Sequence, residues 1–195
     1  MFVNSSEAER NSEFITVWHR AARRILAFGV GMSQVSGKER RLRDTVARGV
    51  DVHIVMVDPE WVLSHPEVSA IFDTFYNRER FGEKFRETHS KLTALALDVN
   101  SEQGREGLRI HTYQSVVPQS VIVADPGTTN AFGFLELHAY GRPTDRIRTL
   151  LPGPDHSGLL LAHTLRSISN LADYDFTREH TDDAGLGLSP MLAFA

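Results

Sequence analysis

Two continuous apolar runs on either side of a helical segment constrain the fold of this chain more than any other feature. Residues 24–31 (RILAFGVG) and 51–58 (DVHIVMVD) are typical of strands buried on both faces. Residues 36–48 between them are expected to form a helix, with Ser36 as its N-cap and Gly49 as its left-handed end. Because the connection from this helix to the second strand is short, the β-α-β unit requires a right-handed crossover and parallel strands.

The remaining pattern extends this unit into a larger sheet. Apolar residues recur at spacings of three and four within residues 12–23, 67–99 and 157–172, which predicts helices. Further strands are expected at residues 109–113, 120–125, 131–140 and 146–151. We therefore predict an α/β fold with a mixed, mostly parallel sheet sandwiched by helices.

A change in composition near the end of the chain divides it into two parts. Residues 1–176 carry the predicted elements and form one domain in this interpretation. From residue 177 the sequence becomes polar and Gly-rich, and then apolar without a clear period. Residues 177–195 are therefore predicted to be a tail that is loose or docked on a partner.

Composition argues against several classes of protein. The chain has no cysteine, which excludes disulfides, thiolate metal sites and a catalytic cysteine. No stretch has the roughly 18 apolar residues that cross a bilayer, and the polar, acidic N-terminus is unlike a signal peptide. The formal net charge of −4 disfavours nucleic acid as the main partner, although local Lys/Arg clusters could hold one or two phosphates. We expect a cytoplasmic protein without a membrane span.

Two turns lie where ligands bind in open α/β sheets, at the carboxyl ends of the strands. Residues 29–37 (GVGMSQVSG) lead into a helix whose free N–H groups favour anions. Asp58 directly follows the second strand. Both features are also typical of purely structural turns. If they bind a ligand, the expected contacts come from Gly31, Ser33, Ser36 and Asp58.

A Pro-Gly hairpin provides a third candidate site. If its loop is residues 126–130, counting outward places Ser120 opposite Glu136 and position 118 opposite His138. Side chains at these positions share one face, with Tyr140 beyond them. A carboxylate beside an imidazole would orient the ring and raise its basicity.

This register predicts roles for the hairpin residues. Glu136 and His138 are the expected acid–base pair, with Asp58 or Asp125 in support, and Ser120 and Tyr140 are expected to contact the ligand. If this end of the strand is solvated instead, the pair is an ordinary surface feature.

The other histidines add one candidate residue and no metal site. His111 lies in the strand at 109–113 and is expected to join the hairpin site. No two histidines have the spacing of a His-Glu-x-x-His metal motif, so neither a metal nor another cofactor is expected.

The order of elements resembles one half of the phospholipase D superfamily over roughly residues 12–172. The similar features are a helix, then AARRILAFGVG, then a helix ending in ARGVDVHIVMVDP, then a late hairpin. The chain is most similar to phospholipase D-like domains that lack the full catalytic motif, some of which accompany bacterial regulatory domains.

The superfamily signature, His-x-Lys followed by four residues and Asp, is incomplete here. Asp125 matches the Asp, but Ser120 stands at the Lys position and Pro118 at the His position. The family mechanism uses the histidine as nucleophile and the lysine to bind phosphate oxygens. The departure from this signature therefore disfavours ordinary phospholipase D activity.

Three functions remain open. The first is a sensory or regulatory pseudo-enzyme that binds a small phosphorylated or nucleotide-like ligand. Single-motif members of the superfamily usually pair to complete their site, so the resemblance also implies a homodimer. The second is a hydrolase or transferase in which His138 and Glu136 act on a phosphoester or glycosidic bond. The third is a structural interaction protein that uses its apolar tail.

Overall fold

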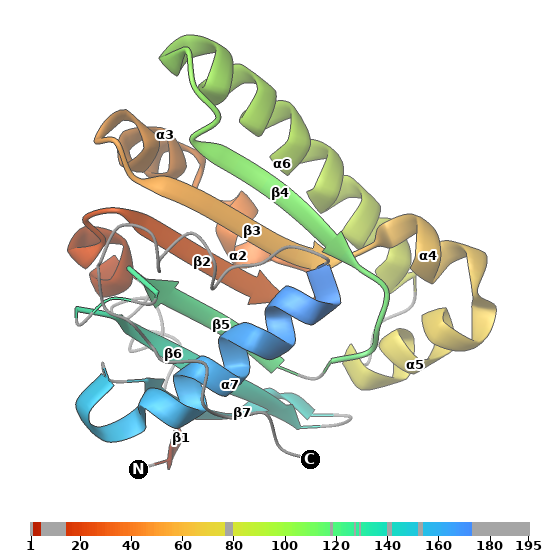
Figure 1. Ribbon diagram of the computed structural model, residues 1–195. Helices are drawn as coiled ribbons and strands as arrows, with labels where there is room; N and C mark the ends of the chain where they lie inside the picture. Colours follow the sequence, from red (N-terminus) through yellow and green to blue (C-terminus); the bar gives the residue numbers. More distant parts are fainter. Residues whose placement is uncertain are drawn as a thin grey trace, which may run out of the picture.

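The computed structural model describes residues 2–4, 15–76, 80–117, 119–126, 128, 130–139, 142–151 and 154–172. Within these residues the chain forms a seven-stranded sheet with helices on both faces (Figure 1). The strand order is β1-β7-β6-β5-β2-β3-β4. Across the part of the chain described, no helix is both long and apolar enough to span a bilayer.

The strands are β1 (Phe2–Asn4), β2 (Arg24–Gly29), β3 (Asp51–Val57), β4 (Leu108–Tyr113), β5 (Gln119–Ala124), β6 (Phe132–Ala139) and β7 (Arg142–Leu151). The helices are α2 (Ser33–Ser36), α3 (Glu39–Ala47), α4 (Pro59–Ser64), α5 (Pro66–Tyr76), α6 (Phe81–Gln103) and α7 (Pro154–Ala172). A short helix at residues 15–20 precedes β2.

The sheet is mixed, and its two kinds of pairing occupy different sides. β2, β3 and β4 are parallel neighbours, as the β-α-β pattern predicts. β5 joins β2 in the antiparallel sense, and β6, β7 and β1 continue the antiparallel pairing. Among the described strands, five of seven therefore run in the same direction. The predicted mixed α/β fold is confirmed, although four of the six pairings between the described strands are antiparallel.

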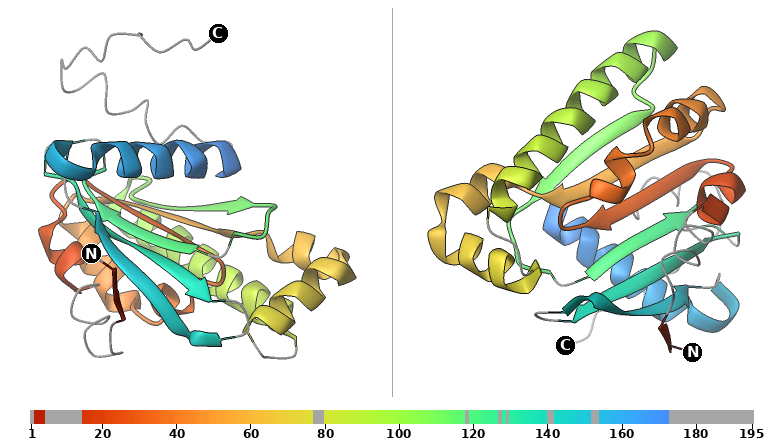
Figure 2. Two further views of the ribbon diagram at one scale, coloured as in Figure 1. Left: turned by 90° about the horizontal axis from the view of Figure 1, so that it is seen from below. Right: turned by 180° about the vertical axis from the view of Figure 1, so that it is seen from behind.

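Helices cover the sheet as the apolar patterns predict. α2, α3 and α6 lie on one face and α7 lies on the other (Figure 2). The predicted inner face of α6 is buried at Phe85, Thr88, Leu92, Leu95 and Val99. In α7, Leu165 and Ile168 are buried as expected. The predicted tail at residues 177–195 lies outside the described residues.

The segment between β2 and β3 differs from the expected single helix. The chain forms the short helix α2, turns at Gly37, and then forms α3. The Ser36 hydroxyl donates to the Ser33 carbonyl oxygen at 3.1 Å, so Ser36 does not act as an N-cap and that prediction is wrong. Lys38 occupies the N-cap position of α3 without a side-chain hydrogen bond. Gly49 has the expected left-handed conformation, with φ of 88°.

Candidate functional site

The hairpin of β5 and β6 has the predicted register. Ser120 is opposite Glu136, Ile122 is opposite Phe134, and Ala124 is opposite Phe132. Glu136 is only 7% exposed, and Phe134 on the same face belongs to the core. The Glu136 carboxylate is therefore buried and is not an ordinary surface group.

The β2–α2 turn meets this hairpin at the carboxyl end of β2. A Cβ atom built on Gly29 would lie 3.0 Å from the Met32 sulfur and 3.0 Å from the Ser120 hydroxyl oxygen. Met32 itself has φ of 47°, which is the left-handed region. Because Gly29 has no side chain, the turn can pack directly against Ser120. We name the group formed by Gly29, Met32, Ser120 and Glu136 the hairpin site.

Two further predicted residues of the hairpin site, His138 and Tyr140, are not fully described by the structure. His138 lies in β6 with its backbone opposite Arg146, but its side chain lies outside the described part of the structure. Tyr140 and Pro118 also lie outside the described residues. The predicted roles of His138 and Tyr140 therefore remain predictions.

The predicted residues of the glycine-rich turn have local structural contacts. A Cβ on Gly31 would lie 2.9 Å from the ring of Phe85, so this glycine allows the turn to pack against α6. Ser33 is exposed, and the Ser36 hydroxyl is hydrogen-bonded within α2. These contacts fit the structural interpretation of this turn.

Asp58 caps a helix at the carboxyl end of β3. Its carboxylate accepts hydrogen bonds from the backbone N–H groups of Glu60 (2.9 Å) and Trp61 (3.3 Å) and from Gln114 Nε2 (3.0 Å). Burial raises the pKa of Asp58, but these hydrogen bonds and the charge of His89 outweigh it, so the pKa lies below its ordinary value. Asp58 is thus an ionised cap at α4, which fits its interpretation as a structural turn.

Asp125 lies at the other end of the sheet from the hairpin site. Its carboxylate accepts hydrogen bonds from the backbone N–H groups of Ala22 (2.9 Å), Arg23 (2.8 Å) and Arg24 (2.9 Å). Five residues of extended strand separate it from Ser120, which corresponds to about 17 Å. The structure therefore does not bring Asp125 to the acid–base pair, and its carboxylate stabilises the start of β2 instead.

His111 also fails to join the hairpin site. Its neighbour on the same face of β4, Tyr113, belongs to the core under α7, whereas Phe134 beside Glu136 belongs to the core under α3 and α6. His111 and Glu136 therefore lie on opposite faces of the sheet. The partner of His111 is His53, whose Nδ1 atom lies 3.1 Å from Nε2 of His111.

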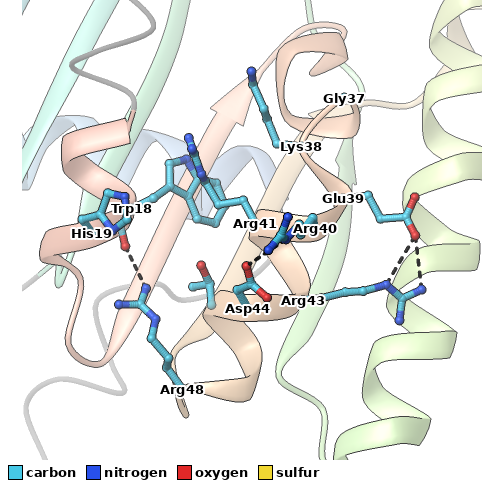
Figure 3. A pocket seen from close by; sticks show the side chains of 11 residues that line it. Trp18, His19, Gly37, Lys38, Glu39, Arg40, Arg41, Arg43, Asp44 and Arg48 are labelled. Atoms are coloured by element: carbon cyan, nitrogen blue, oxygen red, sulfur yellow. Dashed lines mark hydrogen bonds and ion pairs between the residues drawn. The ribbon is translucent and has the colours of Figure 1, made fainter.

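A hollow that the sequence prediction did not include lies beside α3 (Figure 3). Its volume is about 880 Å³, and it is lined by residues 37–41, 43–45 and 48 together with Trp18 and His19. The sequence signal is the stretch at residues 38–48, which contains five Lys or Arg residues. Within the described ranges, no group of three or more His, Asp or Glu side chains is arranged to hold a metal ion.

No family model and no curated protein matches this sequence. Among solved structures, the chain is similar to Nuc, a phospholipase D family member from Salmonella typhimurium, with 15% identity and a TM-score of 0.47 over 84% of this chain and 86% of that one. It is also similar to TrmBL2, an archaeal chromatin protein with a novel mode of DNA binding, with 13% identity and a TM-score of 0.47 over 82% of this chain. This chain spans 47% of the length of TrmBL2.

Proposed function

We propose that this chain is a sensory or regulatory domain that binds a small phosphorylated or nucleotide-like ligand at the hairpin site. The observation that supports the proposal best is the pairing of Ser120 with the buried Glu136 against the Gly29–Met32 turn. This group lies at the carboxyl end of β2, where ligands bind in open α/β sheets.

The chemistry of the two polar side chains suits recognition of such a ligand. The Ser120 hydroxyl can donate a hydrogen bond to a phosphate oxygen, and the Glu136 carboxylate can accept one from a hydroxyl or an N–H group. The two positions thus suit a ligand that carries a phosphate and a hydroxyl or amino group.

The same positions argue against phospholipase D turnover. Pro118 and Ser120 stand where the superfamily has its nucleophilic histidine and its phosphate-binding lysine. Proline has no side-chain nucleophile, and serine has no positive charge for the developing phosphorane. A homodimer, which the resemblance implies, is part of this proposal and is tested by the molar mass in solution.

The register of the hairpin also favours a second candidate function. Because Glu136 is buried opposite Ser120, it could orient an imidazole two positions further along β6, at His138. In this alternative, His138 acts as general acid or base on a phosphoester or glycosidic bond. The two candidates differ in pH dependence, since turnover that needs an imidazole titrates near neutral pH.

A thermal-shift screen against nucleotides, phosphosugars and phospholipid headgroups tests the proposed binding function. A compound at a hundredfold its dissociation constant stabilises the protein by about 2.7 kcal/mol. We expect Ser120→Ala and Glu136→Gln to abolish the shift, and Ser90→Ala on the exposed face of α6 to leave it unchanged. A screen without any stabilising compound, or an equal shift in all three variants, contradicts the proposal.

A further inference from the structure

The hollow beside α3 concentrates positive charge on a chain whose formal net charge is −4. Five of its eleven lining residues are Lys or Arg and two are carboxylates. In Figure 3, the cationic side chains follow α3 from Lys38 at one end to Arg48 at the other. The residues that line the hollow therefore carry a formal charge of opposite sign to that of the whole chain, which favours anions.

Two of the five cations already have carboxylate partners. Arg43 makes ion pairs with Glu39 at 3.2 Å, with Glu102 at 2.8 Å, and with Asp98. Arg40 lies 3.9 Å from Asp44, and both side chains are largely exposed. The two carboxylates of the hollow are thus matched by these two arginines, and the remaining positive charge lies on Lys38, Arg41 and Arg48.

These three residues retain hydrogen-bond donors. The Nη1 atom of Arg41 is buried and has no hydrogen-bond partner among the described residues. Lys38 makes no ion pair with any residue that the structure describes. Arg48 donates from Nη2 to the Trp18 carbonyl oxygen at 2.9 Å, which fixes its guanidinium at the wall of the hollow and leaves its other N–H groups available.

No hydrogen bond joins the guanidinium of Arg41 to another described residue, and a bound anion would supply an acceptor for its accessible N–H groups. Arg41 and Arg48 follow Lys38 by three and ten positions along α3 and its ends. At these spacings the three residues lie on the same side of the helix, over a length of about 15 Å. One phosphate group cannot reach donors spread over that length. The volume of the hollow is also within the range of about 300–1,000 Å³ that small-molecule sites occupy.

We propose that this hollow is an anion-binding site for a small molecule with two or more phosphate groups. The site is built from α3 and the 15–20 helix and shares no residue with the hairpin site. It therefore goes beyond the function proposed above, and it can be correct even if no ligand binds at Ser120 and Glu136.

Titration calorimetry with inorganic triphosphate at low ionic strength tests the site. We expect Arg41→Gln and Lys38→Gln each to weaken binding by about tenfold or more, because each removes one charge-assisted contact. Arg40→Gln is the matched control: it makes the same charge change in the same hollow, but Arg40 is paired with Asp44 and exposed. It should change the affinity by less than about twofold.

The results of these titrations distinguish a defined binding site from a diffuse positive potential. Equal losses in Arg40→Gln and Arg41→Gln, or no binding of triphosphate by the unmodified protein, overturn the proposal. If Arg41→Gln does not fold, Lys38→Gln and Arg41→Lys give the same comparison, and Arg41→Lys should bind more weakly because it lacks the planar fork. Ser120→Ala and Glu136→Gln should leave triphosphate binding intact, and a loss there contradicts a separate site.

Discussion

The imidazole of His53 donates a hydrogen bond to the imidazole of His111, from Nδ1 to Nε2 over 3.1 Å. The direction of this bond follows from Arg109, whose Nη1 lies 3.4 Å from Nε2 of His53. Since a guanidinium only donates, Nε2 of His53 is the acceptor and its proton is on Nδ1. The two rings stack at an interplanar angle of 4°.

Acid should destabilise the protein through this pair. Burial, and then the charge of Arg109, lower the pKa of His111 below its ordinary value of 6.5. The unfolded chain therefore binds a proton at a pH where folded His111 stays neutral, so this contribution to stability is complete above pH 6.5 and decreases as the pH falls below it. The free energy of unfolding in urea, measured from about pH 7.5 to about pH 5.5, should fall.

Two variants identify the source of that fall. His111→Gln should flatten the dependence of unfolding free energy on pH, because it removes the titrating ring. His163→Gln on the exposed side of α7 should leave the dependence as it is. A stability that is constant between these pH values in the unmodified protein contradicts the assignment.

Asp125→Ala should destabilise the fold by about 3 kcal/mol, because it leaves three backbone N–H groups at the start of β2 without their acceptor. Asp125→Asn should cost about 1–2 kcal/mol, since its amide oxygen still accepts a hydrogen bond and asparagine tolerates the φ of 48° at this position. Urea unfolding measures both. Asp44→Ala at an exposed position of α3 is the control, and an Asp125→Ala protein as stable as this control refutes the capping role.

Gly133→Ala should destabilise the protein by about 2 kcal/mol or more, because the added Cβ would lie 2.2 Å from the carbonyl oxygen of Ile122 in the neighbouring strand. Gly37→Ala offers a matched comparison. There the nearest atom is 3.6 Å away and φ is −76°, so the change should be neutral or stabilising by about 0.5 kcal/mol. Similar melting temperatures for the two variants contradict this account.

His138→Ala should abolish ligand binding or turnover, because the register of β6 places this residue two positions beyond Glu136 on the same strand. The measurement is the thermal shift with a compound that stabilises the unmodified protein. His163→Ala should retain the shift, and an unchanged shift in His138→Ala removes this residue from the hairpin site.

Local patterns in the sequence predict the elements and the hairpin register well. Two-residue alternation and a defined loop were enough to place Ser120 opposite Glu136, because a slip by one residue would turn Phe134 away from the core. The buried stripe of α6 follows from its spacing of three and four for the same reason. Each of these predictions depends only on neighbours in sequence or across one turn.

Predictions that depended on the placement of distant strands were less successful. Alternation along β4 places His111 and Tyr113 on one face of that strand. Whether this is the face of the sheet that carries Glu136 depends on how β4, β3, β2 and β5 pair, and the structure places Glu136 on the opposite face. Asp125 matches the Asp of the superfamily signature and was therefore assigned to the site. It follows the end of β5 that lies beside the start of β2, whereas Ser120 lies at the opposite end of β5. The hollow lies between Trp18 and α3. The local sequence around either segment does not show that the other segment packs beside it, so the hollow could not be predicted.

The order of the strands has a consequence for how a newly made chain reaches this fold. β5, β6 and β7 are neighbours in sequence and in the sheet, so they can pair by closing short loops, whereas β2, β3 and β4 need long crossovers. β2 is synthesised before β5, although β5 pairs with the edge of β2 that faces away from β3. That edge therefore has no partner in the sheet until β5 has been synthesised. During synthesis that apolar edge is open to other chains, so slow translation before residue 119 should favour aggregation over folding.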